Sequence, residues 1–225
     1  MSNIIDQPQT VEELVKKALR KAIIAGEFLP GQEIDEGAFA RKLQVSRMPI
    51  RNAISALEVE GLVKRIARRG AFVMELTEDE VEEAYSLRSV IEGKAIVIAS
   101  QRSQESDISR IKEIVDLPKS YYKSPKSFLE KNREFHFQLL KPSKWERSIR
   151  YSTQLRNCFF VYLSLSNGYL ITDIERSLVE HQQIFEAYLK KDFPTLCELN
   201  RAHIETAKKR VIGILNKKIK EKKYV

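Results

Sequence analysis

The three histidines of this chain fall on helix-period stripes of otherwise apolar residues. His136 shares a predicted helical face with Asn132, one turn earlier, and His181 and His203 lie on similar stripes of two later helices. The apolar members of the three stripes are Phe128, Phe135 and Leu139, then Leu178, Phe185 and Tyr188, and then Leu196, Leu199 and Ala207. All four polar side chains are therefore predicted to point into one helical core.

Imidazoles that converge in a core are the usual protein ligands of zinc, nickel and similar ions. We therefore predict a divalent metal site at His136, His181 and His203, beside Asn132, with zinc as the first candidate and nickel or manganese as alternatives. The competing interpretation is that each histidine is a hydrogen-bonded core residue, which is the commoner role of a lone buried histidine. On the sequence alone, both interpretations stay open.

An arginine is expected in the same core. Arg88 lies near the centre of an apolar stripe, and Glu92 follows one turn later. The stripe runs through Val81, Ala84, Arg88, Ile91, Ala95 and Ile98. Because an unpaired buried charge is costly, Arg88 must have a partner, either Glu92 in a salt bridge or an anionic ligand. We predict that Arg88 binds a ligand, with the salt bridge as the alternative.

Catalysis is not expected at these histidines. A three-histidine metal site with an open position is also the layout of hydrolytic zinc sites, but hydrolysis needs a general base close to the metal. Glu134 and Glu180 adjoin the histidines in sequence, and helical geometry predicts that both project off the stripes. A metal-dependent hydrolase is therefore a remote alternative, and we expect no enzyme activity.

A second group of functional side chains lies at the start of a short helix in the first third of the chain. Arg47 and Arg51 are four residues apart and share a face beside Asn52, and Ser46 suits the N-cap position. The arginine fork can bind guanine O6 and N7 or bridge phosphate oxygens, and the amides of a helix N-terminus attract phosphate. We predict that this helix enters the major groove of DNA.

A predicted hairpin tip extends the same basic surface. Arg68, Arg69 and Gly70 lie between two short strands, from which the arginines can reach phosphate or the minor groove. The alternative is that these residues and the basic helix form an ordinary solvated basic face.

Helix caps and chain breakers define the elements that must position these residues. Thr10 with Glu13 predicts the capped start of a first helix, which Gly26 ends. The following elements are predicted as a helix over 36–43, a turn over 44–46, a helix over 47–60 and two strands over 62–66 and 71–75. This order is that of a winged helix-turn-helix, and we assign it to a DNA-binding domain of residues 1–75.

The rest of the chain reads as long helices with short breaks. Thr77 with Glu80 is a second capping box, and it opens the helix that carries Arg88. We predict that residues 76–225 form an all-helical bundle for ligand binding and dimerisation, so the protein is mainly α-helical.

Composition limits the classes of protein to which the chain can belong. Its 225 residues carry a net charge of +8, of which residues 1–74 contribute 12 basic and 9 acidic side chains (+3) and the last ten contribute 5 and 1 (+4). This distribution permits a nucleic-acid partner. No apolar run reaches the roughly 18 residues of a membrane helix, and two cysteines are too few for a disulfide framework. We expect a cytoplasmic protein.

Residues 26–73 resemble the DNA-binding domain of GntR-type bacterial transcription regulators. The matching motifs are Pro30-Gly31, Val45-Ser46-Arg47-Met48-Pro49-Ile50-Arg51, Leu57 to Leu62, and Arg69-Gly70 to Val73. The resemblance implies that Arg47 and Arg51 contact an operator, with Ser46 and the wing assisting. Gly37 stands where members often have an arginine, so the operator preference of relatives is not transferable.

The second domain resembles the FCD ligand-binding domain of the FadR-type branch of these regulators. The matching positions are Arg88 to Glu92, Asn132 to His136, Glu180-His181 and His203. The resemblance implies that Asn132 and the three histidines bind a divalent metal, and that a small carboxylate completes its coordination near Arg88. Asn132 replaces the usual aspartate, and its neutral carbonyl is a poorer ligand. A metal-free polar pocket is therefore the alternative.

Together these observations predict a regulator of transcription that responds to a ligand. We expect a homodimer that binds a palindromic operator in double-stranded DNA, because two identical reading heads require matched half-sites. We expect the protein to act as a repressor and to sense a small anionic metabolite. Such a metabolite must bind more tightly to one arrangement of the two DNA-binding domains. A ligand with equal affinity for both arrangements would not shift the equilibrium between them.

Overall fold

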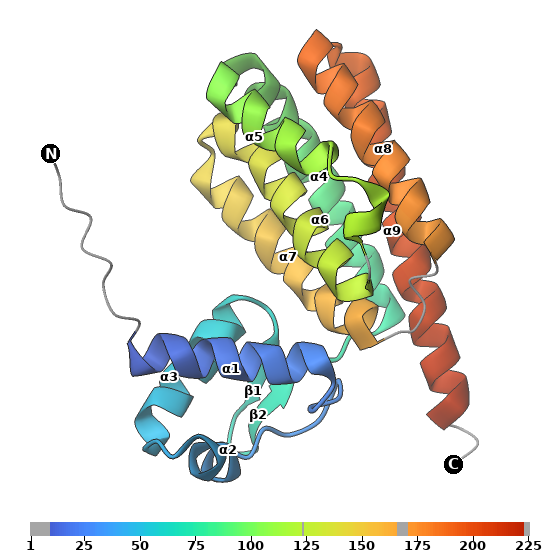
Figure 1. The fold of residues 1–225 in the computed structure, drawn as a ribbon. Helices are drawn as coiled ribbons and strands as arrows, with labels where there is room; N and C mark the ends of the chain where they lie inside the picture. The colour runs from blue at the N-terminus through green and yellow to red at the C-terminus, as the bar shows by residue number, and fades with distance from the viewer. Residues whose placement is uncertain (1–9, 123, 166–170, 223–225) are drawn as a thin grey trace, which may run out of the picture. The chain divides into compact units, whose positions relative to one another are not determined.

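The computed structural model describes residues 10–122, 124–165 and 171–222. The chain divides into two compact units, Met1–Glu75 and Leu76–Val225, both of which are drawn in Figure 1. Each unit has its own buried apolar residues. The fold is mainly helical, with a helix-turn-helix and a two-stranded wing followed by a helical bundle, as the sequence predicts.

The first unit is a winged helix-turn-helix. Its elements are α1 (Val11–Ala25), α2 (Glu36–Leu43), α3 (Arg47–Val59), β1 (Val63–Ile66) and β2 (Gly70–Val73). The capping box of Thr10 and Glu13 forms, and Gly26 ends α1 with the positive φ of 80° that glycine tolerates. α1 packs against α3 through fully buried side chains, including Leu19, Ile23, Ile50 and Ile54. This packing fixes which face of α3 is left outside.

The wing differs slightly from the sequence prediction. β1 and β2 pair antiparallel with Val63 opposite Val73, so the second strand is shorter at its end than predicted. The other edge of β2 is covered by the segment before α2. Val73 donates to the carbonyl of Gln32 at 2.9 Å, and Ile34 donates to the carbonyl of Ala71 at 2.8 Å. This segment was not predicted to pair, and it ties the wing to the start of α2.

The second unit is a helical bundle (Figure 1). Its elements are α4 (Glu78–Arg102), α5 (Glu105–Val115), η1 (Lys119–Tyr121), α6 (Pro125–Leu140), η2 (Lys141–Ser143), α7 (Glu146–Leu165), α8 (Ile171–Lys190) and α9 (Phe193–Lys222). The capping box of Thr77 and Glu80 starts α4 as predicted. α4 contacts α6, α7, α8 and α9, so its buried face is the centre of the bundle.

The core of the bundle is split into two apolar clusters. One cluster holds Val81, Phe128, Phe159, Ile174 and Ile204, among others. The second cluster holds Ala95, Phe135, Ile184 and Leu196, among others. Buried polar side chains occupy positions between these clusters along the helices, and they include Arg88, Glu92, His136, Ser152, His181, Asn200 and His203. Burying polar groups in a core costs free energy unless each group has a partner. A buried polar layer is therefore a candidate functional site.

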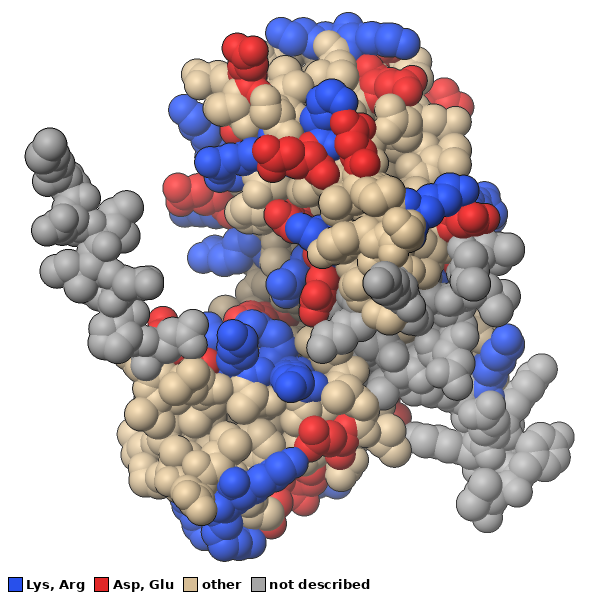
Figure 2. All heavy atoms as spheres, in the orientation of Figure 1, with Lys and Arg blue, Asp and Glu red and all other residues tan. Residues whose placement is uncertain are grey.

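The surface of the bundle carries no patch of one sign in the view of Figure 2, where basic and acidic side chains intermingle. In the same view, Lys and Arg side chains gather on the first unit at the end where Figure 1 places α2. Within the described part of the chain, no helix combines the length and the apolarity that a bilayer crossing demands.

Candidate DNA-binding helix and candidate metal centre

The outer face of α3 carries the polar side chains that the sequence assigns to DNA. Arg47, Arg51 and Asn52 are exposed, whereas Ile50 and Leu57 on the opposite face are fully buried. Ser46 occupies the N-cap, but its hydroxyl makes no capping hydrogen bond within the described residues. The helix therefore begins with an exposed hydroxyl and exposed guanidinium groups, a set of donors that suits a phosphate or a base edge.

Two of these side chains are held by carboxylates from neighbouring helices. Nε of Arg51 donates to Oε2 of Glu36 at 3.0 Å, and Nδ2 of Asn52 donates to Oε2 of Glu12 at 3.1 Å. The Arg51 side chain is 57% exposed. Since an exposed ion pair contributes about 0–1 kcal/mol, a phosphate or guanine can displace Glu36 at little cost.

The tip of the wing presents Arg68, Arg69 and Gly70, all exposed. Arg68 and Gly70 have positive φ angles of 61° and 109°, which turn the chain tightly between the strands. The Arg69 guanidinium lies over the Phe72 ring at 5.8 Å from its centroid. The geometry agrees with a solvent-facing basic tip, and its contact with DNA stays a prediction.

Arg65 is a positioning residue that the sequence interpretation missed. Its guanidinium donates to Oγ of Ser55 at 2.9 Å and to the carbonyl of Arg51 at 3.0 Å, and it pairs with Glu58 at 3.6 Å. These bonds join β1 to the outer side of α3. The Arg65 side chain therefore helps to hold the wing against the candidate DNA-binding helix.

In the second unit, the three histidines converge. His136 comes from α6, His181 from α8 and His203 from α9, and all three are buried. One ring nitrogen of each lies within 4.8 Å of one ring nitrogen of both others, and Nε2 of His203 is 3.1 Å from Nε2 of His136. The predicted convergence is confirmed, and this cluster could hold a metal ion.

Burial keeps these imidazoles neutral. Loss of solvent lowers the pKa of His136 and His181 well below the ordinary value, and the positive charge of Arg156 lowers both further. Burial also lowers the pKa of His203, although its hydrogen bond to Glu180 opposes the shift. A metal ligand must be a neutral imidazole with a free lone pair. The electrostatic environment therefore provides the form that a metal needs.

Glu180 faces the histidine cluster, so the prediction that it projects away from the histidines is wrong. Its Oε2 lies 2.7 Å from Nδ1 of His203. Burial alone would raise the pKa of Glu180, but His203 and Arg176 lower it, so the group is a carboxylate and can only accept. Nδ1 of His203 must then carry the proton, which leaves the lone pair on Nε2 facing His136. The periodicity of α8 could not show this contact because the partner lies on α9.

One buried atom of the cluster has no partner. Nε2 of His181 makes no hydrogen bond to any described residue, while the ring stacks on Phe135 with centroids 4.1 Å apart. An unsatisfied buried nitrogen costs about 1–3 kcal/mol. If His136, His181 and His203 bind a metal ion and His181 coordinates it through Nε2, this nitrogen gains a partner. The donor set therefore fits a divalent ion such as zinc.

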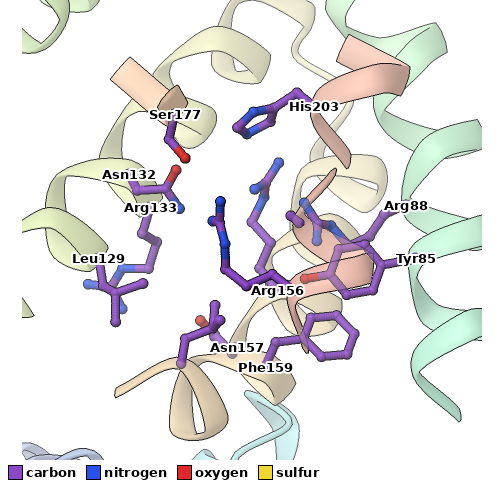
Figure 3. Close-up of a pocket in the computed structure, with 13 residues that line it drawn as sticks. Tyr85, Arg88, Leu129, Asn132, Arg133, Arg156, Asn157, Phe159, Ser177 and His203 are labelled. Atoms are coloured by element: carbon purple, nitrogen blue, oxygen red, sulfur yellow. The ribbon is translucent and has the colours of Figure 1, made fainter. Parts of the chain in front are cut away.

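Asn132 lies close to the cluster but is only partly buried. It lines a cavity of about 50 Å³ together with Arg88 and His203, and also a smaller cavity that His181 lines. Figure 3 shows Asn132, His203, Arg88 and Arg156 around the first of these, the inner cavity. This position supports Asn132 as a fourth ligand, and its coordination stays a prediction.

Arg88 makes the salt bridge that was the alternative to ligand binding. Its Nε donates to Oε1 of Glu92 at 3.0 Å, and Oγ of Ser152 donates to the same oxygen at 2.7 Å. Arg156 pairs with the other oxygen of Glu92. Burial would raise the pKa of Glu92, but the two guanidinium groups outweigh it and keep the carboxylate charged. Because Arg88 also lines the inner cavity, its predicted role with a ligand remains open.

Arg156 is a further residue of the polar layer, and it was not predicted from the sequence. It comes from α7, where Ser152, Arg156, Phe159 and Leu163 follow helical spacing toward the core. This stripe was readable in the sequence. Arg156 lines the inner cavity and also a larger open groove of about 650 Å³ beside α6 and α7. His136 lines that groove as well, so the histidine cluster adjoins space on two sides.

Comparisons with known families match both units. Residues 12–73 match the model of bacterial regulatory proteins of the gntR family, and residues 83–206 match the FCD domain. The chain is 27% identical over 224 residues to the HTH-type transcriptional regulator YdhC of Bacillus subtilis strain 168, covering 98% of this chain and 95% of that protein. It is 27% identical over 180 residues to the gluconate operon transcriptional repressor of Bacillus licheniformis, covering 77% and 74%.

Solved structures show the same fold. A transcriptional regulator GntR of Rhodococcus sp. RHA1 aligns with a TM-score of 0.70 and 24% identity, covering 90% of this chain and 97% of that one. E. coli McbR/YncC aligns with a TM-score of 0.77 and 16% identity, covering 94% and 100%. At these identities, the likeness concerns the arrangement of the helices and the wing.

Proposed function

The chain belongs to the gntR family of bacterial regulatory proteins, with an N-terminal helix-turn-helix domain and a C-terminal FCD domain, and on this premise we propose that it is a metal-containing, metabolite-responsive repressor. It is a transcriptional regulator by family and not an enzyme. In this proposal, the protein acts in the cytoplasm, binds a palindromic operator as a homodimer and responds to a small anionic metabolite.

The proposed DNA surface consists of the start of α3 and the wing tip. Ser46, Arg47, Arg51 and Asn52 are exposed at the start of α3. The wing adds Arg68, Arg69 and Gly70. Arg47 and Arg51 read base edges or bind phosphate from the major groove, and the wing binds the flanking backbone.

One observation carries the proposed metal site: three buried neutral imidazoles from three helices converge, and one of them has an orphaned nitrogen. In this proposal His136, His181 and His203 bind zinc, with nickel or manganese as alternatives, and Asn132 supplies a fourth, weaker ligand. The metal gives the inner cavity a Lewis-acidic centre for an oxyanion. A metal-free polar pocket is the second candidate, because the neutral carbonyl of Asn132 is a poor metal ligand.

Exposed apolar residues on the outer face of α4 favour the proposed dimer. Leu87 and Val90 on this helix are 47% and 70% exposed, and Glu83 and Lys94 flank them at equal distances along the helix. If α4 of a second copy packs antiparallel on this face about a two-fold axis, Glu83 of each copy lies opposite Lys94 of the other. The charge pattern is therefore self-complementary.

The direction of regulation is proposed from named relatives. The gluconate operon proteins of Bacillus licheniformis and Bacillus subtilis are named as transcriptional repressors, as is RspR of Escherichia coli. In the proposed mechanism, a ligand bound in the bundle favours an arrangement of the two DNA-binding domains that no longer matches the operator.

Footprinting on the DNA upstream of the protein's own gene tests this proposal. We expect protection of two inverted half-sites whose centres are about one helical turn, or a multiple of it, apart, because the two heads are related by symmetry. The assay is repeated with zinc and with pooled small carboxylates, and one pool is expected to release the protection.

Two results would contradict the proposal. A protein that gives the same weak protection on unrelated DNA would not be a specific regulator. Protection of a single half-site by a protein of monomer mass would exclude the dimer.

A further inference from the structure

The outer face of α3 has an apolar side chain at its centre. Met48 is the second residue of α3 and is 60% exposed. In a helix of about 3.6 residues per turn, Met48 lies about 180° from Ile50 and Leu57, which are both fully buried. Asn52 and Ser55 follow it along the same exposed line at helical spacing. Met48 therefore projects from the middle of the face that packing leaves outside.

The polar side chains beside Met48 are bonded to the flanking helices. Arg51 donates to Glu36 of α2 at 3.0 Å, whereas Asn52 donates to Glu12 of α1 at 3.1 Å. Around the helix, Arg51 lies about 60° to one side of Met48 and Asn52 about 40° to the other. Met48 stands between them and carries only a thioether, which is a weak hydrogen-bond acceptor. It is therefore the apolar part of an otherwise polar face.

A lone exposed apolar side chain is common on protein surfaces and by itself indicates no site. Met48 differs by its position, because the N-terminal residues of a helix in the major groove are those that reach base edges. Arg47 and Arg51, its neighbours at the start of α3, are also exposed. If α3 enters the groove as proposed, the Met48 side chain faces base edges.

The base edges of the major groove offer Met48 one matching group. Of the groups that distinguish the bases there, only the C5-methyl group of thymine is apolar. The others are hydrogen-bond donors and acceptors, which lose water and gain no strong partner when a thioether side chain covers them. Methionine is unbranched and has three rotatable bonds, so it adapts easily to the position of a methyl group. Met48 therefore matches thymine better than any other base.

We propose that Met48 determines operator specificity by packing against the C5-methyl group of one thymine in each half-site. The inference deepens the proposed function and rests on its placement of α3 in the major groove. Arg47 and Arg51 cannot recognise this methyl group, since an arginine fork binds guanine or phosphate. Loss of the methyl contact should lower affinity about fourfold per half-site, the equivalent of about 0.8 kcal/mol for one buried carbon group, and about 15-fold when both half-sites lose it.

The test replaces thymine with deoxyuridine in the operator duplex that the footprint identifies. Deoxyuridine keeps the base pair and every donor and acceptor of thymine, and it lacks only the methyl group. The same position is changed in both half-sites of a duplex, one position at a time, and the affinity of the full-length protein is measured by fluorescence anisotropy. We expect one position to lower affinity by about 15-fold and the others to have small effects.

Variants of Met48 assign the effect to this side chain. Met48→Ala should bind the thymine and deoxyuridine duplexes equally, because the apolar contact is already lost. Met48→Leu keeps an apolar side chain of similar volume and should retain most of the preference. Val59→Ala is the matched control, since Val59 is 64% exposed on the same face about three turns later, and it should retain the full preference. Chemical unfolding should show little change in any of these variants, because both positions are exposed.

The outcomes separate this inference from the proposed function. If Arg51→Ala weakens operator binding but no deoxyuridine substitution does, the thymine contact is wrong and the proposed DNA surface stands. An equal loss on deoxyuridine in the wild type and Met48→Ala would assign the effect to the shape of the DNA and would also overturn the inference. If the protein binds no operator, the proposed function fails and this inference fails with it.

Discussion

Replacing His181 with leucine is expected to abolish metal binding and to leave the metal-free protein at least as stable as the wild type. The two side chains are close in volume, so packing against Phe135 is largely retained. The change removes the buried Nε2 that has no partner among the described residues, and that atom costs about 1–3 kcal/mol. It also removes one of the three converging imidazoles. Loss of a residue that only supports a metal ligand lowers metal affinity by up to about 100-fold, so loss of a ligand should lower it by more.

The measurement is chemical unfolding of chelator-treated protein, with and without added zinc. Zinc at 100 times its dissociation constant should raise the free energy of unfolding of the wild type by about 2.7 kcal/mol. The Leu variant should gain nothing. His203→Leu is the matched comparison, because it should also lose zinc but should destabilise the metal-free protein by removing the hydrogen bond to Glu180, which then keeps its pairing with Arg176. Retention of zinc stabilisation by His181→Leu would rule out His181 as a ligand.

Arg51→Ala is expected to lower operator affinity by roughly 5- to 150-fold, which corresponds to the loss of about 1–3 kcal/mol for a bidentate base contact. Arg51 is exposed on the outer face of α3 and makes no contribution to the buried core. The free energy of unfolding should therefore change little. If Arg51 binds phosphate instead, affinity should fall by a similar factor on all DNA sequences. The plot of log affinity against log salt concentration should also become less steep by about one unit.

Binding curves on operator and on random DNA at several salt concentrations measure this effect. Glu36→Gln is the control, because it breaks the same ion pair and leaves the arginine in place. Its operator affinity should be unchanged or slightly higher, since a competing carboxylate is gone. Unaltered binding by a folded Arg51→Ala variant would refute the assignment of α3 as the reading helix.

Local signals in the sequence were enough to predict most of the fold. The capping boxes at Thr10 and Thr77 and the stop at Gly26 depend on residues within one helical turn, and the structure contains all three. The segment that covers β2 was not predictable in this way. Its pairing, through Gln32 and Ile34, is made with residues some forty positions later and leaves no periodic pattern in so short a stretch.

The candidate site likewise contains features that one helix encodes and features that depend on how helices pack together. Each histidine was assigned to the core from the stripe of its own helix, and convergence followed because the bundle has one interior. The contact of Glu180 with His203 depends on how α8 and α9 pack, which a single helix does not encode. Arg156 was predictable from local periodicity, since Ser152, Arg156 and Phe159 follow helical spacing. For Arg88, the buried charge was predicted and its partner is Glu92.

Metal content tests the central claim most directly. The full-length chain is purified without an affinity tag or chelator and analysed for its elements. We predict about one divalent metal ion per chain, zinc before nickel or manganese, and a sharp loss of thermal stability after chelation. Protein that contains no metal and shows no thermal shift with any of the three ions would contradict the claim, and the histidine cluster would then be a metal-free polar core.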